Sequence, residues 1–146
     1  MSTTPTFGAA VLGQTEKALN AILDRHLAGT GLTERQWIAL TLTVVGGGAV
    51  DRRELVGRLA GGLKISDAAA EAEIDQLTSA QLLEPVDGAS KLKVTDAGQE
   101  LHARIRTTVS QTTDQMWGDL PAEDLETTGR VLSTILARAN EELAAA

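Results

Sequence analysis

The sequence contains no cysteine and few aromatic side chains, and both absences narrow what the chain can do. Without cysteine, the chain has no disulfide bond, thiolate zinc site, iron–sulfur cluster or cysteine nucleophile. Aromatic residues make up 2% of the chain, namely Phe7, Trp37 and Trp117, and tyrosine is absent. This argues against proteins that read single-stranded nucleic acid, because such proteins stack bases on aromatic side chains.

Long apolar segments are also missing. No window approaches the roughly 18 consecutive apolar residues of a membrane-spanning helix, and residues 1–5 lack the basic and apolar regions of a secretory signal. The chain has 146 residues, 42% of them apolar, and at this length folding hides about 68–70% of the unfolded surface. We therefore expect a soluble, cytoplasmic protein whose core needs no cofactor, metal or disulfide.

Positive charge is in the minority. Thirteen Lys and Arg stand against twenty Asp and Glu, which gives a formal net charge of −7. An acidic chain is not steered as a whole toward nucleic acid, so any such binding has to come from a local basic patch.

Motifs of catalysis are absent as well. The glycine clusters at 46–48 and 61–62 lack the Lys-Ser/Thr of a nucleotide-binding loop, and no serine lies in a Gly-x-Ser-x-Gly elbow. Two isolated histidines, His26 and His102, have no carboxylate at metal-ligand spacing. We expect neither an enzyme nor a metal site.

Proline occurs only at positions 5, 85 and 121, and breakers this sparse favour long helices. Polar residues typical of helix N-caps, namely Thr33, Asp51, Ser66 and Thr95, precede runs with helical apolar spacing. We expect Gly61-Gly62 to end the third helix and Pro121 to open the last one. The predicted order is helices over 7–28, 33–44, 51–60 and 66–77, strands over 82–86 and 91–94 around Asp87-Gly88, and helices over 95–116 and 121–143.

This order predicts an all-α fold with a small β-hairpin wing, formed as one domain over residues 1–146. Three short helices and a hairpin (residues 32–95) make a winged helix-turn-helix, whose recognition helix normally enters the DNA major groove. The terminal helices (7–31 and 96–145) carry apolar stripes, which a second copy of the chain would bury in a two-fold dimer. The alternative is that these helices pack within one chain as a bundle.

Three stretches together resemble the multiple-antibiotic-resistance regulator (MarR) family. Residues 31–40 (GLTERQWIAL) resemble the family's G-L-T-x-x-Q-[WF]-x-x-L helix opening. Residues 74–84 resemble the end of its recognition helix and the entry to its wing, and residues 93–101 (KVTDAGQEL) resemble the L-T-x-x-G-x-x-L that leaves the wing. The three occur in the family's order and spacing.

The resemblance implies a dimeric transcriptional regulator that binds double-stranded DNA at a palindromic operator, here expected to be a ligand-responsive repressor. Many members release DNA when a small aromatic ligand enters the cleft between the dimer helices and the DNA-binding lobe. We expect Trp37 and His26 to contact such a ligand, since an indole can stack on an aromatic effector. The alternative for Trp37 is a core tryptophan that bridges the first and second helices.

The DNA-binding positions depart from the family pattern. Residues 66–82 contain four acidic side chains and no Lys or Arg, and the tip at 87–90 lacks the arginine that commonly enters the minor groove. Over residues 51–95, six basic side chains stand against eight acidic ones, a net charge of −2.

Two hypotheses account for this departure. In the first, cations at the rim contact phosphates while two residues at the start of the recognition helix approach bases. The residues concerned are Arg52, Arg53, Lys64, Lys91 and Lys93 for phosphates and Ser66 and Asp67 for bases. In the second, specific DNA binding is lost, and the chain is a ligand-sensing or protein-binding homologue whose acidic helix meets a basic protein surface. We predict DNA binding.

Overall fold

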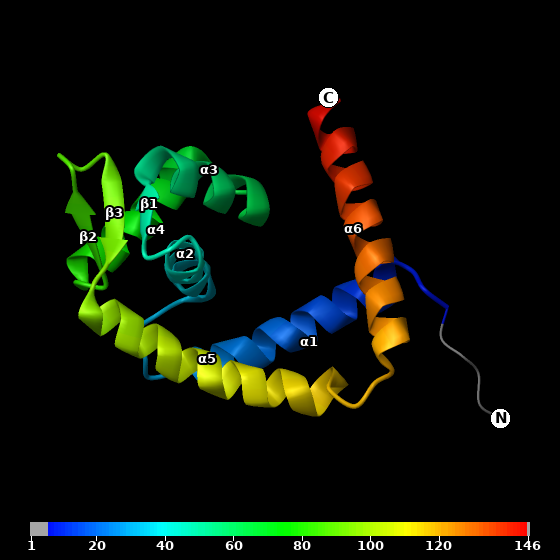
Figure 1. Cartoon of the computed structure of the whole chain (residues 1–146). Coiled ribbons are helices and arrows are strands. Elements are labelled where there is room, and N and C mark those ends of the chain that lie inside the picture. Colours follow the sequence, from blue (N-terminus) through cyan, green and yellow to red (C-terminus); the bar gives the residue numbers. More distant parts are fainter. Residues whose placement is uncertain (1–5, 146) are drawn as a thin grey trace. The chain divides into compact units, whose positions relative to one another are not determined.

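The computed structural model describes residues 6–145 (Figure 1), so the expectation about a secretory signal in residues 1–5 lies outside the described residues. The predicted fold class is confirmed, because six helices accompany one small antiparallel sheet. In chain order the elements are α1 (Ala9–Leu27), α2 (Glu34–Val45), β1 (Ala49–Asp51), α3 (Arg52–Leu63), α4 (Asp67–Ser79), β2 (Leu83–Val86), β3 (Lys91–Val94), α5 (Asp96–Trp117) and α6 (Ala122–Ala144).

The chain divides into two compact units. Among the described residues, the first unit runs to Val109 and holds α1 to α4, the sheet and the larger part of α5. The second unit begins at Ser110 and holds the end of α5 and all of α6. Within the described residues, no helix is both long and apolar enough to cross a membrane.

Each predicted N-cap residue caps the start of its helix. Thr33 accepts a hydrogen bond from the backbone N–H of Gln36 and donates its own N–H to the Gln36 side chain, a complete capping box. Asp51 caps α3, and Ser66 Oγ accepts from the N–H of Ala69 at 3.1 Å to cap α4. Thr95 Oγ1 accepts from the N–H of Gly98 at 3.0 Å at the start of α5. These local signals set the helix boundaries.

The sheet has a third strand that the sequence did not predict. The β2–β3 hairpin is as expected, but β1 pairs antiparallel with the other edge of β3, in the order β1-β3-β2. Gly47 and Gly48 have φ angles of 98° and 91°, which turn the chain out of α2 into β1. Val94 N–H then donates to Gly48 O at 2.8 Å. A three-residue strand has too short a pattern to be recognised without its partner.

Two predicted helix ends are wrong. The pair Gly61-Gly62 lies inside α3, which continues to Leu63 and ends at Lys64 in the left-handed conformation (φ 58°). Each glycine weakens a helix by about 1 kcal/mol, but tertiary packing of Leu59 in the core holds α3 across the pair. The predicted start of the last helix is also wrong, because Pro121 is the N-cap of α6 and Ala122 is its first residue.

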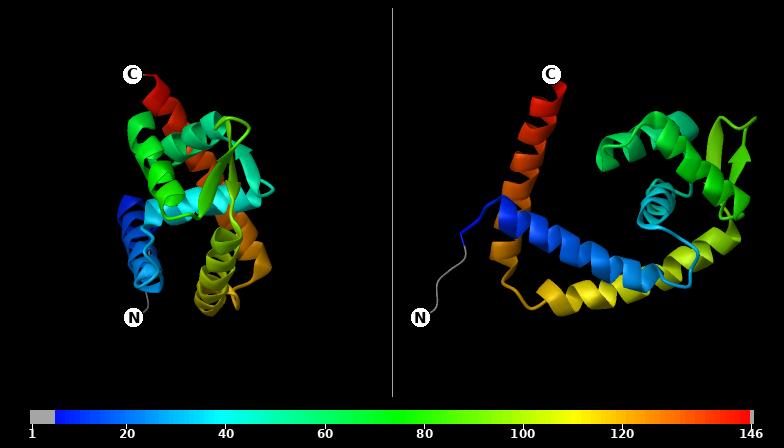
Figure 2. Two further views of the ribbon diagram at one scale, coloured as in Figure 1. Left: turned by 90° about the vertical axis from the view of Figure 1, so that its left-hand side faces the viewer. Right: turned by 180° about the vertical axis from the view of Figure 1, so that it is seen from behind.

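Helix α2 is the centre of the winged lobe (residues 32–95). It packs on α1, α3, α4 and the sheet, and Figure 2 shows it enclosed by these elements. Ile105 extends the core onto α5. The largest fully buried side chains are Leu40, Leu55, Leu59, Ile74, Leu77, Leu83, Leu92 and Thr43.

The start of α5 lies against the entry to the wing. A Cβ at Gly98 would overlap the carbonyl oxygen of Leu82 and lie 2.8 Å from Cγ2 of Val94. Thr95 fixes the same junction, because its hydroxyl donates to the backbone oxygens of Gln81 and Leu82. Only glycine therefore allows this close approach of helix and strand.

Helix α6 has no buried residue, although an apolar stripe runs along it. Its exposed large apolar side chains are Val131, Leu132, Leu136 and Leu143. In the first unit, Val11 and Leu12 of α1 are exposed as well. These helices thus present uncovered apolar surface in a single chain.

Candidate nucleic-acid interface

Helix α4 occupies the position of the recognition helix and carries carboxylates along one face. Asp67, Glu71 and Asp75 follow at four-residue intervals, which places them one above the other on the helix. Glu73 lies elsewhere, since its carboxylate accepts from the hydroxyl of Thr33 at 3.5 Å.

Arg52, predicted to contact phosphate, is bound to this acidic face. Its Nη2 donates to Oε2 of Glu71 at 2.6 Å and to Oδ1 of Asp75 at 2.9 Å, and its Nε donates to the same Glu71 oxygen at 3.1 Å. The hydrogen bond to Glu71 raises the pKa of Arg52 against the opposing effect of burial, and Asp75 raises it further. The guanidinium is therefore engaged by two carboxylates of α4.

Arg52 also joins α4 to the wing. Its backbone N–H donates to the carbonyl of Ser90 in the hairpin loop at 3.0 Å. The chain positions 52, 71, 75 and 90 thus meet at one place, which lies beside a hollow of about 520 Å³. That hollow is lined by Asp51, Arg52, Arg53, Val56, Asp67, Glu71, Ala89 and Ser90.

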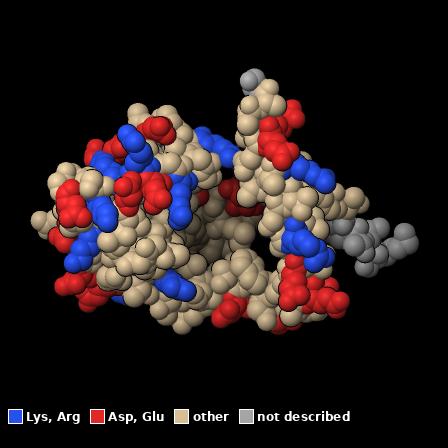
Figure 3. Space-filling model, turned by 45° about the horizontal axis from the view of Figure 1, so that its top comes forward, with Lys and Arg blue, Asp and Glu red and all other residues tan. Residues whose placement is uncertain are grey.

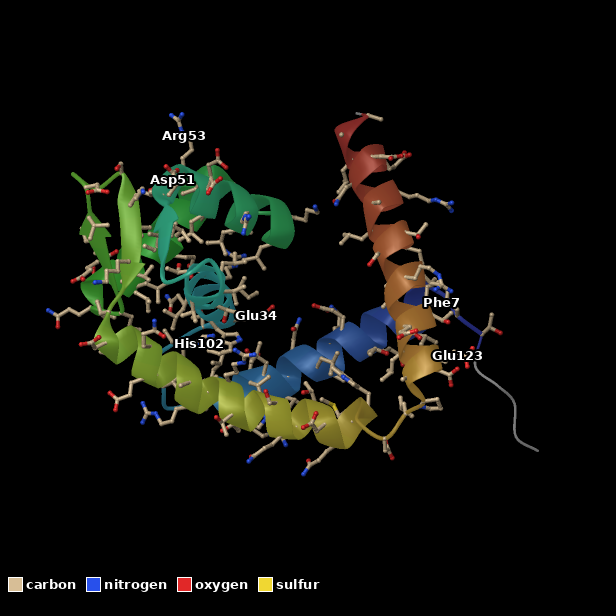
Figure 4. All side chains as sticks on the ribbon, viewed as in Figure 1. Phe7, Glu34, Asp51, Arg53, His102 and Glu123 are labelled. Carbon is tan, nitrogen blue, oxygen red and sulfur yellow. The ribbon has the colours of Figure 1, made fainter. Side chains whose placement is uncertain are left out.

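Arg53, the next residue, has a different environment. It is exposed and points away from the lobe (Figure 4). No ion pair involves it among residues 6–145. Ser66 and Asp67 stand at the exposed start of α4. Arg52, Arg53 and Asp67 all line the same hollow.

The three predicted lysines are more scattered. Lys91 and Lys93 are exposed on β3, where Lys93 stands in register with Glu84 of β2. Lys91 lines a separate hollow of about 280 Å³ together with Asp51, Glu54 and Arg58. Lys64 donates its ammonium to the carbonyl of Gly61 at 2.8 Å.

Charges of both signs alternate over the face of the lobe that Figure 3 shows. Lys and Arg side chains stand beside Asp and Glu side chains there, and no area of one sign spans the face. The pairing of Arg52 with Glu71 and Asp75 is one instance of this pattern. Sequence reasoning missed it, because no local signal marks a contact between residues 19 and 23 positions apart.

Trp37, predicted to contact an effector, is stacked on His102. Their ring centroids are 4.8 Å apart with an interplanar angle of 19°, and only 9% of Trp37 and 4% of His102 are exposed. Nε2 of His102 is buried without a hydrogen-bond partner. Burial lowers the pKa of His102, and the charge of Arg106 lowers it further. Trp37 is thus a buried residue of the core, but the stack joins α2 to α5, whereas the core alternative expected Trp37 to bridge the first and second helices.

His26, the other predicted ligand residue, lines a hollow of about 280 Å³ that does not include Trp37. Arg104 and Thr108 of α5 contribute polar groups to this hollow, while Leu101 and Ile105 contribute apolar surface. Sequence reasoning did not select Arg104, because its place opposite the end of α1 depends on tertiary packing. Among residues 6–145, no three potential ligands of the His, Asp or Glu type converge as a metal site would require.

No family model and no curated protein matches the sequence. Solved structures do match. A MarR-family transcriptional regulator from Silicibacter pomeroyi has a TM-score of 0.76 at 20% identity, over 92% of this chain and 90% of that chain. NadR in complex with 4-hydroxyphenylacetate has a TM-score of 0.73 at 22% identity, over 92% and 97%.

CouR from Rhodococcus jostii RHA1, bound to p-coumaroyl-CoA, has a TM-score of 0.73 at 18% identity, over 86% of this chain and 88% of that chain. At such identities the likeness concerns the fold. The resemblance seen in the three sequence stretches is confirmed at that level, and the chain has the winged-helix fold of the MarR-family transcriptional regulators.

Proposed function

We propose that this protein is a DNA-binding transcriptional regulator, a ligand-responsive repressor that acts as a homodimer on a palindromic operator. The observation that carries the proposal is the placement of α3, α4 and the β2–β3 wing in the winged-helix arrangement, with the start of α4 exposed. Structural neighbours with this fold are named as transcriptional regulators. We further propose a cytoplasmic, non-enzymatic protein without a cofactor.

In this proposal, exposed cations beside α4 and on the wing contact the phosphate backbone. Arg53, Lys91 and Lys93 are exposed in the structure, and Lys64 follows the end of α3. Each phosphate contact releases counterions and contributes about 0.9 to the slope of log affinity against log salt. Asp67, at the first turn of α4, would accept a hydrogen bond from cytosine N4, which is the base-edge donor suited to a carboxylate.

Dimerisation supplies the second recognition helix. The apolar stripe of α6 and the exposed apolar residues of α1 would be buried against a second copy of the chain. A two-fold dimer matches a palindromic operator, because its two helices enter half-sites about 34–36 Å apart.

The effector is proposed to be a small aromatic acid. Two neighbours were solved with 4-hydroxyphenylacetate and p-coumaroyl-CoA. In this chain, His26 and Arg104, which line one hollow, would hold a carboxylate. Trp37 lies outside that hollow and is stacked on His102, so it would reach the aromatic ring only by parting from His102 and opening toward the hollow. A ligand that prefers a dimer geometry unfit for two successive major grooves lowers operator affinity by its differential binding energy.

A salt series tests DNA binding. Purified protein is titrated onto duplex DNA from upstream of its own gene, with excess competitor duplex, at salt concentrations from about 50 to 200 mM. We expect a competition-resistant complex whose affinity falls linearly on a log–log plot. Replacing Arg53 by Gln should weaken binding to all duplexes and reduce the slope by about 0.9, as loss of one phosphate contact does.

The acidic face of α4 favours a second candidate, a homologue that binds ligand or protein but not DNA. In that case no competition-resistant complex forms even at about 50 mM salt, where phosphate contacts are strongest. The same titration therefore separates the two candidates.

A further inference from the structure

The three side chains of Arg52, Glu71 and Asp75, here called the Arg52 cluster, carry a further inference that rests on the proposed function. Two of the four carboxylates of α4 belong to this cluster. Of the other two, Glu73 faces Thr33, the N-cap of α2, and Asp67 has no ion pair among the described residues. The negative charge of the acidic face of α4 is thus partly compensated at Glu71 and Asp75.

The geometry of the cluster conflicts with a phosphate contact by Arg52. Its side chain is 25% exposed, compared with 69% for Asp75. Its Nη2 donates to both carboxylates, and its Nε donates to Glu71 as well. Turning the guanidinium to a phosphate would break these charge-assisted hydrogen bonds and leave two uncompensated carboxylates beside the same phosphate backbone.

Arg52 is also the point where three elements meet. It is the first residue of α3, its side chain holds α4, and its backbone N–H holds the carbonyl of Ser90 in the wing loop. A fixed relation between α4 and the wing matters for DNA binding, because both have to reach their grooves in one docking geometry.

We propose that Arg52 is a positioning residue that holds Glu71 and Asp75, offsets one of their two negative charges and thereby helps an acidic recognition helix to approach DNA. Arg52 does not contact phosphate in this arrangement. Its loss lowers affinity because the net charge of the cluster beside the backbone changes from −1 to −2. One unit charge within about 5–10 Å of a phosphate in water corresponds to a loss of about two- to fourfold.

A charge-deletion cycle tests this inference. We compare the wild type, R52Q, the double variant E71Q/D75N and the triple variant R52Q/E71Q/D75N in the salt series described above. R53Q is the matched control, since Arg53 is the adjacent arginine and is exposed without an ion pair among the described residues. Circular dichroism and urea unfolding of each variant monitor folding.

The expected result is a loss of about two- to fourfold for R52Q, with a salt slope that stays within about 0.3 of the wild-type slope, well below the 0.9 of one phosphate contact. The triple variant should recover at least wild-type affinity with the wild-type slope. If R52Q unfolds, the triple variant decides by its slope, because it leaves no charge of the cluster unpaired. R53Q should lower the slope in every background.

Two results would overturn the inference. A salt slope reduced by about 0.9 in both R52Q and the triple variant would show that Arg52 contacts a phosphate. An unchanged affinity of R52Q would show that Arg52 has no role in DNA binding. In both cases the wild type still binds duplex DNA, so the proposed function stands. Absence of binding by the wild type and by E71Q/D75N would overturn the proposed function and the inference together.

Discussion

At the scale of single residues, the buried pair of Trp37 and His102 has the clearest chemical consequence. The imidazole is stacked on the indole, almost fully buried, and its Nε2 has no hydrogen-bond partner. A protonated ring at this place would lack both solvent and a counterion, because the nearest charge that acts on it is the cation Arg106. The folded chain therefore favours the neutral imidazole.

This environment predicts a pH-dependent stability. Burial lowers the pKa of His102 below the ordinary value of 6.5. Below about pH 6.5 the imidazole therefore binds a proton in the unfolded chain more readily than in the folded chain, and the free energy of unfolding decreases as the pH decreases. The loss ends once the pH is below the folded-state pKa. Compared with wild type, His102→Phe should gain relative stability as pH falls from 7.5 to 5, measured by urea unfolding at each pH.

The comparison has an internal control, because every ionisable side chain except residue 102 is the same in both proteins and its contribution cancels in the difference. A difference in the free energy of unfolding that stays constant across this range would contradict the prediction.

Effector binding at Trp37 can be followed by fluorescence. A ligand that parts Trp37 from His102 would alter the fluorescence of Trp37, measured in a Trp117→Phe background.

At the scale of elements, the junction between the wing and α5 depends on one missing side chain. Gly98 allows α5 to start against the carbonyl of Leu82. Thr95 caps the helix at the same place and ties it to Gln81 and Leu82, which connect α4 to β2. The T-x-x-G part of the motif that leaves the wing thus has a steric explanation.

The prediction is that Gly98→Ala destabilises the fold by about 1–3 kcal/mol, the usual cost of overpacking a rigid site. The opposing gain in helix propensity is about 1 kcal/mol. The matched control is Gly57→Ala in α3, where an added Cβ meets nothing within 4 Å and should stabilise by about 0.5–1 kcal/mol. Urea unfolding of the two variants should give opposite signs, and equal signs would refute the steric explanation.

At the scale of the whole molecule, the apolar stripe of α6 is exposed and would be covered by a partner in the proposed dimer. Leu136 is 58% exposed and Leu143 is 62% exposed in the single chain, and α6 buries no residue of its own. Helices of this length owe most of their stability to packing of an apolar face. The proposed dimer supplies that packing.

Leu136→Glu tests the dimer. A carboxylate buried in an apolar interface costs about 3 kcal/mol or more, so the dissociation constant of the dimer should rise about 100-fold or more. Sedimentation equilibrium should show a shift toward the 15.3 kDa monomer. Thr134→Glu is the matched control, because residue 134 lies on the opposite side of α6 and its substitution should leave the mass unchanged. A wild-type protein that is monomeric at all concentrations would instead support the alternative of a single-chain bundle.

The elements of this fold could be predicted from sequence because their signals are local. Caps at Thr33, Ser66 and Thr95 and the Asp87-Gly88 turn act within one helical turn or one hairpin. The third strand and the course of α3 through Gly61-Gly62 could not be predicted, because both depend on a partner element. The same holds for the candidate site. The sequence identified its cations, but it did not show that Arg52 pairs with Glu71 and Asp75.

By itself, the sequence determined the order of the elements, the absence of thiol chemistry and the acidic composition of the recognition helix, since each depends on residue identity or short-range spacing. Only the tertiary structure decided how those charges are used. It paired Arg52 with Glu71 and Asp75, left Arg53 exposed, and stacked Trp37 on His102. These contacts join residues 19 to 65 positions apart, and their energies depend on distance and burial, which chain order does not encode in any local pattern.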